Sequence, residues 1–379
     1  MMLDLIIVGG GMSGISVGHF FRDKKILLLE KGNLLSGATG NNAGFLIAGF
    51  GEHFKRTVSR FGMSMAREIQ EMHRSNHRRI RDLSTILKTP YNASGSFSLP
   101  LDSKEETELR ESLELLKQAG YAVEWRDDPQ IGLRKSRGAL WNPDDAFIDA
   151  PLFWNALARE LPVKQATPVL QVQNEKGAIV VKTPGDTYRA QNIVFCLDAF
   201  SSELVPELRG RYMPLRGQIV EVAAEHHLPE IPVIAEYGNL YWRFAPGKLI
   251  FGGLESEFPQ EEAGVATELS TAIEMRQIEW IRANFNVKTD RRISSRFGTM
   301  AYTLDGFPFV GALPQPRRFV LAGTCGLGHS YTLEAASWLH SLIAKDRNVT
   351  PDYCSSDRIE KMPVHSEGDW RTLYEAWNY

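Results

Sequence analysis

The 379-residue sequence predicts an α/β fold that opens with a strand, a helix and a second strand, and three observations support this prediction. The apolar run at residues 3–8 is typical of a buried strand. The glycine run Gly9–Gly14 follows it directly, and a second apolar strand at residues 25–30 ends on Glu30. A strand, then G-x-G-x-x-G, a helix and an acidic residue about twenty positions later indicate a dinucleotide-binding βαβ unit.

Each glycine of this motif has its own expected role. Gly9 permits the tight turn after the strand, Gly11 lets the backbone approach a pyrophosphate, and Gly14 lets the helix pack closely on the strand. The helix that begins at Met12 and Ser13 offers free N–H groups and a partial positive charge to the phosphates.

The residues after the second strand narrow the choice of cofactor. Glu30 can accept hydrogen bonds from a ribose diol and repels a 2′-phosphate, so FAD or NAD is favoured over NADP. Lys31 is assigned to the same site. The loop at residues 36–44 has three glycines and two asparagines, which is typical of backbone that approaches a ligand closely. We interpret it as a second cofactor contact, which favours FAD; the alternative is a flexible surface loop. The contacts are expected from Ser36, Thr39, Gly40, Asn41, Asn42, Ala43 and Gly44.

Five segments in order carry a resemblance to a known family. They are the loop at 36–44, P-L-R-G-Q at 214–218, an aromatic strand ending in Gly-Gly at 241–253, the stretch 298–308 and a glycine-rich loop at 323–328. The chain resembles the FAD-dependent amine and amino-acid oxidoreductases related to D-amino-acid oxidase, glycine oxidase and sarcosine oxidase, and γ-glutamylputrescine oxidases are nearest in motif. The resemblance implies a Rossmann-like βαβ FAD-binding domain with an inserted mixed α+β substrate domain, and noncovalent FAD.

The resemblance also implies domain limits. The FAD-binding domain is expected to be discontinuous, at residues 1–88, 146–210 and 296–379, with the substrate domain at 89–145 and 211–295. Further cofactor contacts are expected at Val169, Gly298, Gly326, Leu327, Gly328 and His329.

Periodicity and capping signals predict the remaining elements. Ser103, with Glu106 three residues later, is expected to cap a helix, and Asp149 with Pro151 to begin another. The spacing of Trp370, Tyr374 and Trp377 suggests a helix that docks on the core or on a partner subunit. Helices are predicted at 54–87, 103–119, 267–285 and 330–344, and strands at 169–181, 192–197, 318–323 and within 211–258.

The resemblance implies that the enzyme oxidises the C–N bond of a small amine or amino acid. Hydride passes to flavin N5, the imine is hydrolysed, and O2 takes the electrons and gives H2O2. A dehydrogenase with another electron acceptor stays open. Two alternatives are a 2-hydroxy-acid oxidase or dehydrogenase on the same fold, and a flavoprotein whose FAD is not catalytic.

Alignment with the family assigns two substrate residues. Tyr241 matches a tyrosine that reaches the substrate, and Trp242 is a candidate wall of the pocket. Met300 falls where glycine and D-amino-acid oxidases place an arginine that grips the substrate carboxylate, although a one-residue slip would bring Arg296 there. Gly326 falls on a second such arginine. We therefore expect a reactive amine without an adjacent carboxylate, or with one held differently.

Two histidines are candidates for the pocket. His53 follows the flavin loop, where family members place residues over the ring, and His329 begins the last predicted helix. Either is a candidate base for hydroxy-acid oxidation. His73 and His77 are four residues apart on a helix, but they lie among arginines, so we predict a solvated basic face rather than a metal site.

Composition sets the remaining expectations. The net charge of −3 offers no attraction to nucleic acid or anionic membranes. The three cysteines form no CxxC pair, which indicates a reducing compartment, and we expect a cytoplasmic protein without a transmembrane segment. The expected partners are a small amine and O2 or another electron acceptor, and an oligomer is possible.

Overall fold

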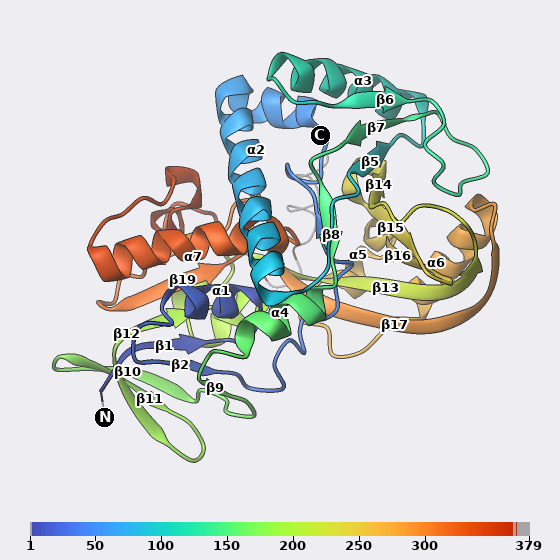
Figure 1. The fold of residues 1–379 in the computed structure, drawn as a ribbon. Coiled ribbons are helices and arrows are strands. Elements are labelled where there is room, and N and C mark those ends of the chain that lie inside the picture. The colour runs from blue at the N-terminus through green and yellow to red at the C-terminus, as the bar shows by residue number, and fades with distance from the viewer. Residues whose placement is uncertain (1, 367–368, 370–379) are drawn as a thin grey trace.

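The computed structural model describes residues 2–366 and 369 of the chain. In these residues the strands form two eight-stranded sheets and one three-stranded sheet, which helices cover and connect (Figure 1). Trp370, Tyr374 and Trp377, expected to dock as a helix, lie outside the described residues. No helix within the described residues is long and apolar enough to cross a membrane.

The first sheet has a parallel centre in which β2, β1, β12 and β19 are neighbours in that order. Their carboxyl ends therefore meet at one edge, which is the usual binding edge of such sheets. The four central strands are β1 (Met2–Val8), β2 (Ile26–Leu29), β12 (Thr187–Phe195) and β19 (Arg318–Ala322). The flanking strands are β9 (Val163–Lys164), β10 (Gln171–Glu175), β11 (Ala178–Lys182) and β18 (Phe309–Ala312).

Helices pack beside the parallel strands and against one another. α1 (Met12–Phe20) lies between α4 (Ala150–Ala158) and α7 (Gly328–Lys345), and the long α2 (Phe54–Leu87) crosses α7 (Figure 1). The α4 start is as predicted, because the Asp149 side chain accepts a hydrogen bond from the Leu152 N–H and Pro151 stands in the first turn. α2 is interrupted at Gly62, whose φ of 77° is not helical.

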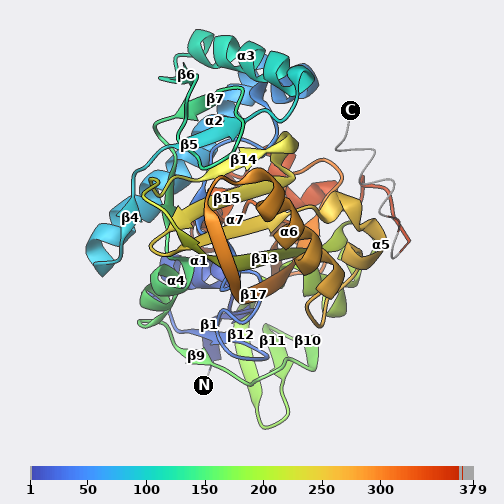
Figure 2. The same ribbon diagram turned by 90° about the vertical axis from the view of Figure 1, so that its right-hand side faces the viewer.

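The second sheet has the order β17-β13-β16-β15-β14-β5-β7-β6. Figure 2 shows α6 (Thr271–Asn284) lying over β13 and β17. Trp280 of α6 packs with Trp242 and Phe285 in one aromatic core. The strands are β5 (Ser96–Leu99), β6 (Glu124–Arg126), β7 (Ala139–Asn142), β13 (Met213–Glu225), β14 (Val233–Ala235), β15 (Leu240–Ala245), β16 (Lys248–Gly253) and β17 (Lys288–Tyr302).

Short elements join the two large sheets. β8 (Ala146–Ile148) pairs with β3 (Phe45–Leu46) and β4 (Tyr91–Asn92). β17 is continuous from Lys288 to Tyr302, so the domain limit expected at residue 296 falls inside a strand. β17 thus runs from the second sheet, called the substrate sheet below, to the residues that follow β12 of the first sheet.

Two local predictions are wrong. α3 (Ser103–Gln118) is capped by Asp102, whose carboxylate accepts a hydrogen bond from the Glu105 N–H at 2.8 Å, so the cap is one residue earlier than the predicted Ser103. His73 and His77 do not lie on a solvated face. Both are buried against α7, where His73 packs edge-on against Tyr331 and His77 Nε2 lies 3.2 Å from Ser330 Oγ.

Candidate active site

A cavity of about 610 Å³ follows the carboxyl edge of the parallel strands. It is lined by residues that come directly after β1, β2, β12 and β19, together with the loop at 36–42 and part of β17. The predicted cofactor residues that line it are Gly9, Gly11, Met12, Ser13, Glu30, Lys31, Ser36, Thr39, Asn41, Asn42, Val169, Gly298, Gly326, Gly328 and His329.

Gly9 and Gly14 occupy positions where a side chain does not fit. Gly9 has a φ of 110°, and a Cβ on it would lie 2.3 Å from the carbonyl oxygen of Cys196. A Cβ on Gly14 would lie 1.9 Å from the carbonyl oxygen of Gly9. Gly14 itself does not line the cavity, so it acts by allowing α1 to approach β1, and this sets the N-terminus of α1 at the cavity.

Glu30 links the glycine turn to the end of β2. Its two carboxylate oxygens accept hydrogen bonds from the Gly10 N–H at 2.6 Å and the Gly32 N–H at 2.8 Å. A carboxylate has about four lone-pair sites, so these two bonds leave the carboxylate able to accept two more. This arrangement fits a ribose diol.

The loop at 36–44 is held by its own polar side chains. Asn42 Nδ2 donates to the Thr39 carbonyl at 2.7 Å, and Thr39 Oγ1 accepts from the Met12 N–H at 3.0 Å. Of the predicted loop contacts, Ala43 and Gly44 line the adjoining cavity, whereas Gly40 lines neither. Gly40 is instead packed against the Leu35 carbonyl, which a Cβ on it would approach to 2.2 Å.

Sequence reasoning missed Asp198, a half-buried residue shortly after the end of β12 that lines the cavity. Its carboxylate accepts hydrogen bonds from the N–H groups of Ala301 at 2.9 Å, Gly323 at 3.0 Å and Thr324 at 3.2 Å. It therefore ties β12, β17 and the loop before α7 together. The available signal was an acidic residue in a turn where the resembled family commonly has glycine or asparagine.

A second cavity of about 370 Å³ adjoins the first and lies against the substrate sheet. It is lined by predicted residues Tyr241 and Leu327 and by the turn before β15. Residues that line both cavities mark the junction between them: Ala38, Asn41, Asn42, Gly298, Met300, Gly326 and His329.

Tyr241 faces the second cavity because its cross-strand partner has no side chain. Tyr241 on β15 is paired with Gly252 on β16, and a Cβ on Gly252 would lie 2.4 Å from the phenolic oxygen. The ring therefore lies over Gly252. Trp242 points to the opposite face, as strand alternation requires, so it is a core residue and the prediction that it walls the pocket is wrong.

Met300 lines both cavities and therefore lies at their junction. Its Cε would be 2.7 Å from a Cβ on Gly217 of β13. Arg296, the alternative cation, lines only the first cavity, and its guanidinium is paired with Glu221 and directed at the Asn42 carbonyl.

His329 lies in the first turn of α7 and is held in one protonation state. The Trp154 indole N–H donates to His329 Nε2 at 3.0 Å, and because the indole is a donor only, Nε2 carries no proton. Burial lowers the pKa of His329 to about 4. The ring at the junction is thus neutral near pH 7, and its Nε2 is already occupied.

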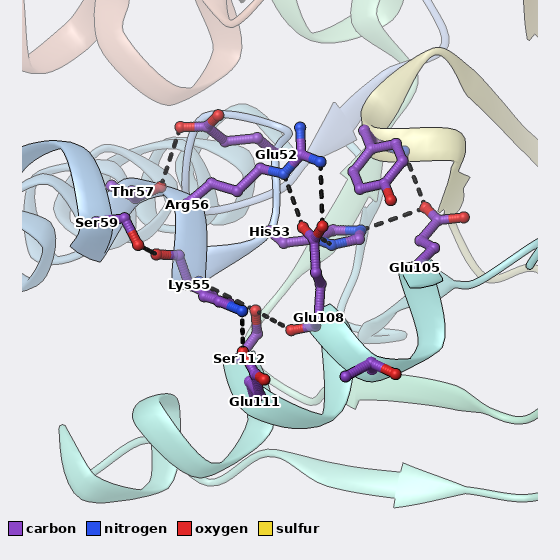
Figure 3. Close-up of polar contacts among 12 residues, drawn as sticks. Glu52, His53, Lys55, Arg56, Thr57, Ser59, Glu105, Glu108, Glu111 and Ser112 are labelled. Atoms are coloured by element: carbon purple, nitrogen blue, oxygen red, sulfur yellow. Dashed lines mark hydrogen bonds and ion pairs between the residues drawn. The ribbon is translucent and has the colours of Figure 1, made fainter. Parts of the chain in front are cut away.

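His53 is not at the cavity, in contrast to the prediction of a place over the flavin ring. It stands at the N-terminus of α2 and points toward α3, where Nε2 lies 3.3 Å from Glu105 and Nδ1 lies 3.7 Å from Glu108 (Figure 3). Its neighbours Glu52 and Arg56 do line the second cavity. At the start of α2, Glu52 and Arg56 therefore face the second cavity, and His53 faces away from it.

The second cavity also holds acidic residues that sequence reasoning did not select. Glu255 and Glu262 both line it, beside Arg216 of the P-L-R-G-Q stretch. The sequence signal was weak, because Glu255–Glu262 resembles an exposed acidic turn.

The chemistry of the first cavity fits FAD. Glycine backbone, a helix N-terminus and Glu30 suit the pyrophosphate and ribose, and the junction suits the isoalloxazine ring. Cys325 lines the second cavity, but burial raises the pKa of its thiol to about 12, so it stays protonated. Among the described residues there is no cluster of three or more potential metal ligands.

The comparisons with known proteins agree with this geometry. A family model described as FAD dependent oxidoreductase matches residues 4–342. The chain is 24% identical to a glycine oxidase of Geobacillus kaustophilus (strain HTA426) over 345 aligned positions, 84% of this chain and 87% of that one. It is 22% identical to a glycine oxidase of Bacillus subtilis (strain 168), over 94% and 97% of the two chains. The crystal structure of the Geobacillus kaustophilus glycine oxidase superposes with a TM-score of 0.78 at 20% identity, covering 92% of this chain and 96% of that one.

Proposed function

The chain belongs to the family of FAD-dependent oxidoreductases, and we propose that it oxidises the C–N bond of a small amine whose reacting carbon bears no carboxylate. FAD held by the glycine turn after β1 and by Glu30 would supply the hydride acceptor, and would return the electrons to O2 or another acceptor. The product imine is hydrolysed to a carbonyl compound in water.

The observation that carries the proposal is that none of the described residues places an available guanidinium at the junction of the two cavities. Among the described residues, Met300 and neutral His329 are the large side chains there. Arg296 is paired with Glu221, and the Arg216 terminal nitrogens donate to the carbonyls of Glu268 and Glu261. Arg56, which lines the second cavity, donates to both carboxylate oxygens of Glu108. A substrate carboxylate would therefore lack the bidentate fork that such groups usually receive.

Tyr241 is the residue we assign to substrate positioning. Burial raises its pKa well above the usual value, so the phenol stays protonated and can both donate and accept a hydrogen bond. The reacting amine must be neutral to release hydride, and a neutral phenol does not favour its protonated form.

The hydroxy-acid alternative receives less support from the geometry. It needs a base near the reacting carbon, and its two candidates are unsuited. His53 lines neither cavity, and Nε2 of His329 accepts the Trp154 indole proton.

The test is anaerobic mixing of the FAD-loaded protein with a panel of amines, amino acids and 2-hydroxy acids, followed by flavin bleaching. We expect bleaching by amines without an α-carboxylate. Bleaching by glycine, D-amino acids or hydroxy acids instead would refute the substrate proposal, and no bleaching by any of them would favour a non-catalytic flavin. Readmission of O2 with assay of H2O2 then distinguishes an oxidase from a dehydrogenase.

A further inference from the structure

Three ionisable side chains from separate segments meet on one side of the second cavity. Arg216 comes from β13, Glu255 from the η4 turn (Glu255–Glu257) and Glu262 from the short helix α5 (Pro259–Glu262). The proposed function assigns a substrate contact to none of the three.

Glu262 is a buried carboxyl without a hydrogen-bond partner. Its side chain is 3% exposed, and neither oxygen receives a hydrogen bond. The nearest cation is Nε of Arg216, at 3.8 Å from Oε1, which is beyond hydrogen-bond distance. A buried carboxyl oxygen that receives no hydrogen bond lowers the stability of the folded protein, unless a ligand supplies the donor.

Arg216 does not neutralise the site fully. Its Nη1 donates to the Glu268 carbonyl at 3.1 Å and its Nη2 to the Glu261 carbonyl at 2.6 Å, so the guanidinium fork is occupied by backbone. Two carboxylates against one guanidinium leave one net negative charge when both acids are ionised.

Glu255 extends this charge toward the flavin end of the cavity. Its Oε1 would lie 3.7 Å from a Cβ on Gly217, the same position that lies 2.7 Å from Met300 Cε. Glu255 and Met300 therefore lie over the same glycine. Burial raises the pKa of Glu255 to about 7, and burial together with the Glu255 charge raises the pKa of Glu262 to about 8. A cation between the two carboxyls would reverse both shifts.

The reacting nitrogen is a poor occupant of this site. Hydride transfer requires the neutral amine, whereas a neighbouring carboxylate stabilises the ammonium form. The site is better suited to a positive charge that persists through the reaction.

We propose that Glu255 and Glu262 bind a second, permanently protonated nitrogen of the substrate, so that the substrate is a diamine or an amine with a similar distal cation. This inference rests on the proposed function for the identity of the reacting end. It adds a recognition site that discriminates diamines from monoamines.

Binding to the FAD-loaded protein tests the proposal without turnover. The probe is a diamine whose two nitrogens are both on quaternary carbons, so it has no hydride to lose, and tert-butylamine is the matched monoamine. Titration calorimetry and the flavin absorption spectrum report binding. We expect Glu255→Gln and Glu262→Gln each to weaken diamine binding about tenfold or more, the equivalent of one charged hydrogen bond. Binding of the monoamine should be unchanged.

Glu257→Gln is the control, because Glu257 is in the same turn but is exposed and paired with Arg276 at 2.7 Å. Flavin content and circular dichroism verify that each variant is folded. Equal loss of diamine and monoamine binding would overturn the proposal, as would wild-type protein that does not prefer the diamine. If the diamine binds through Glu262 but butanediamine does not bleach the flavin, the cation site stands and the proposed oxidation fails.

Discussion

Gly298 of β17 packs directly on the backbone of Ala38, so that a Cβ on Gly298 would lie 2.5 Å from the Ala38 Cα. The contact joins the strand of the substrate sheet to the cofactor loop. Both residues line both cavities. The junction of the two cavities therefore depends on the absence of a side chain at one position.

We predict that Gly298→Ala weakens FAD binding at least tenfold, because the added methyl must displace the loop or the strand. Titration of the apoprotein with FAD measures the change. Gly185→Ala, in the turn between β11 and β12 where nothing lies within 4 Å of the added Cβ, should bind FAD as the wild type does. If Gly298→Ala and Gly185→Ala bind FAD with equal affinity, the loop and the strand accommodate the methyl group without loss of FAD binding, and the prediction is wrong.

The buried histidines predict that the free energy of unfolding decreases as the pH falls. Burial lowers the pKa of His73 to about 3 and that of His329 to about 4, and it lowers the pKa of His77 well below the usual 6.5. In the unfolded chain these imidazoles gain protons below pH 6.5, so stability is present above that pH and is lost as the pH falls toward 4.

The expected slope is about 1.4 kcal/mol per pH unit for each imidazole that stays neutral when folded. Urea unfolding at pH 7, 6 and 5 measures it. His329→Gln should flatten the slope, whereas His227→Gln, at an exposed position, should not. A slope that His329→Gln leaves unchanged would contradict the assignment of a neutral His329.

Met300→Arg should not by itself create an amino-acid oxidase. Met300 and Glu255 lie over the same glycine, so the new guanidinium is expected to pair with Glu255 rather than with a substrate carboxylate. Met300→Arg combined with Glu255→Gln should raise kcat/KM for glycine or sarcosine at least about tenfold over the single variant.

Stopped-flow flavin reduction measures this difference. Met300→Arg combined with Glu257→Gln is the control for the loss of one acidic group. If the single variant already matches the double variant with glycine, the predicted pairing with Glu255 is wrong.

Glu262→Gln should stabilise the substrate-free protein at alkaline pH. The pKa of Glu262 is raised to about 8 from 4.5, so the protonated form is favoured on folding and stability is lost as the pH rises through 8. Glutamine removes that ionisation, so we expect a gain of about 1–3 kcal/mol at pH 9 that shrinks toward pH 5.

Urea unfolding at pH 9 and pH 5 checks this expectation, with Glu257→Gln as the control. A variant that is less stable than the wild type at pH 9 would mean that ionised Glu262 has a partner. The diamine probe should then also fail to stabilise the wild type.

The cofactor half of the site was predictable because its residues are close in sequence. Gly9–Gly14, Glu30 and the loop at 36–44 lie within the first 44 residues, and backbone geometry at each glycine decides what fits. The family assignment, the α/β fold and the FAD cofactor are confirmed by the match over residues 4–342 and by the superposition on glycine oxidase. Tyr241 lines the second cavity because side chains alternate between the two faces of a strand, and this alternation can be read from the sequence.

The substrate half of the site was not predictable from local sequence patterns, because it depends on contacts between residues that are distant in the chain. His53 turned to α3 because Glu105 and Glu108, more than fifty residues away in the chain, face it there. His73 and His77 are buried because α7 crosses α2. Glu255, Glu262 and Arg216 form one site only when β13, η4 and α5 fold together.

The sequence alone determined the cofactor class and the fold, because a βαβ unit and a glycine turn are specified by neighbours in the chain. The tertiary structure decided which charges face the substrate, because the burial and the partners of an ionisable side chain depend on segments that are distant in sequence and meet only in the folded protein.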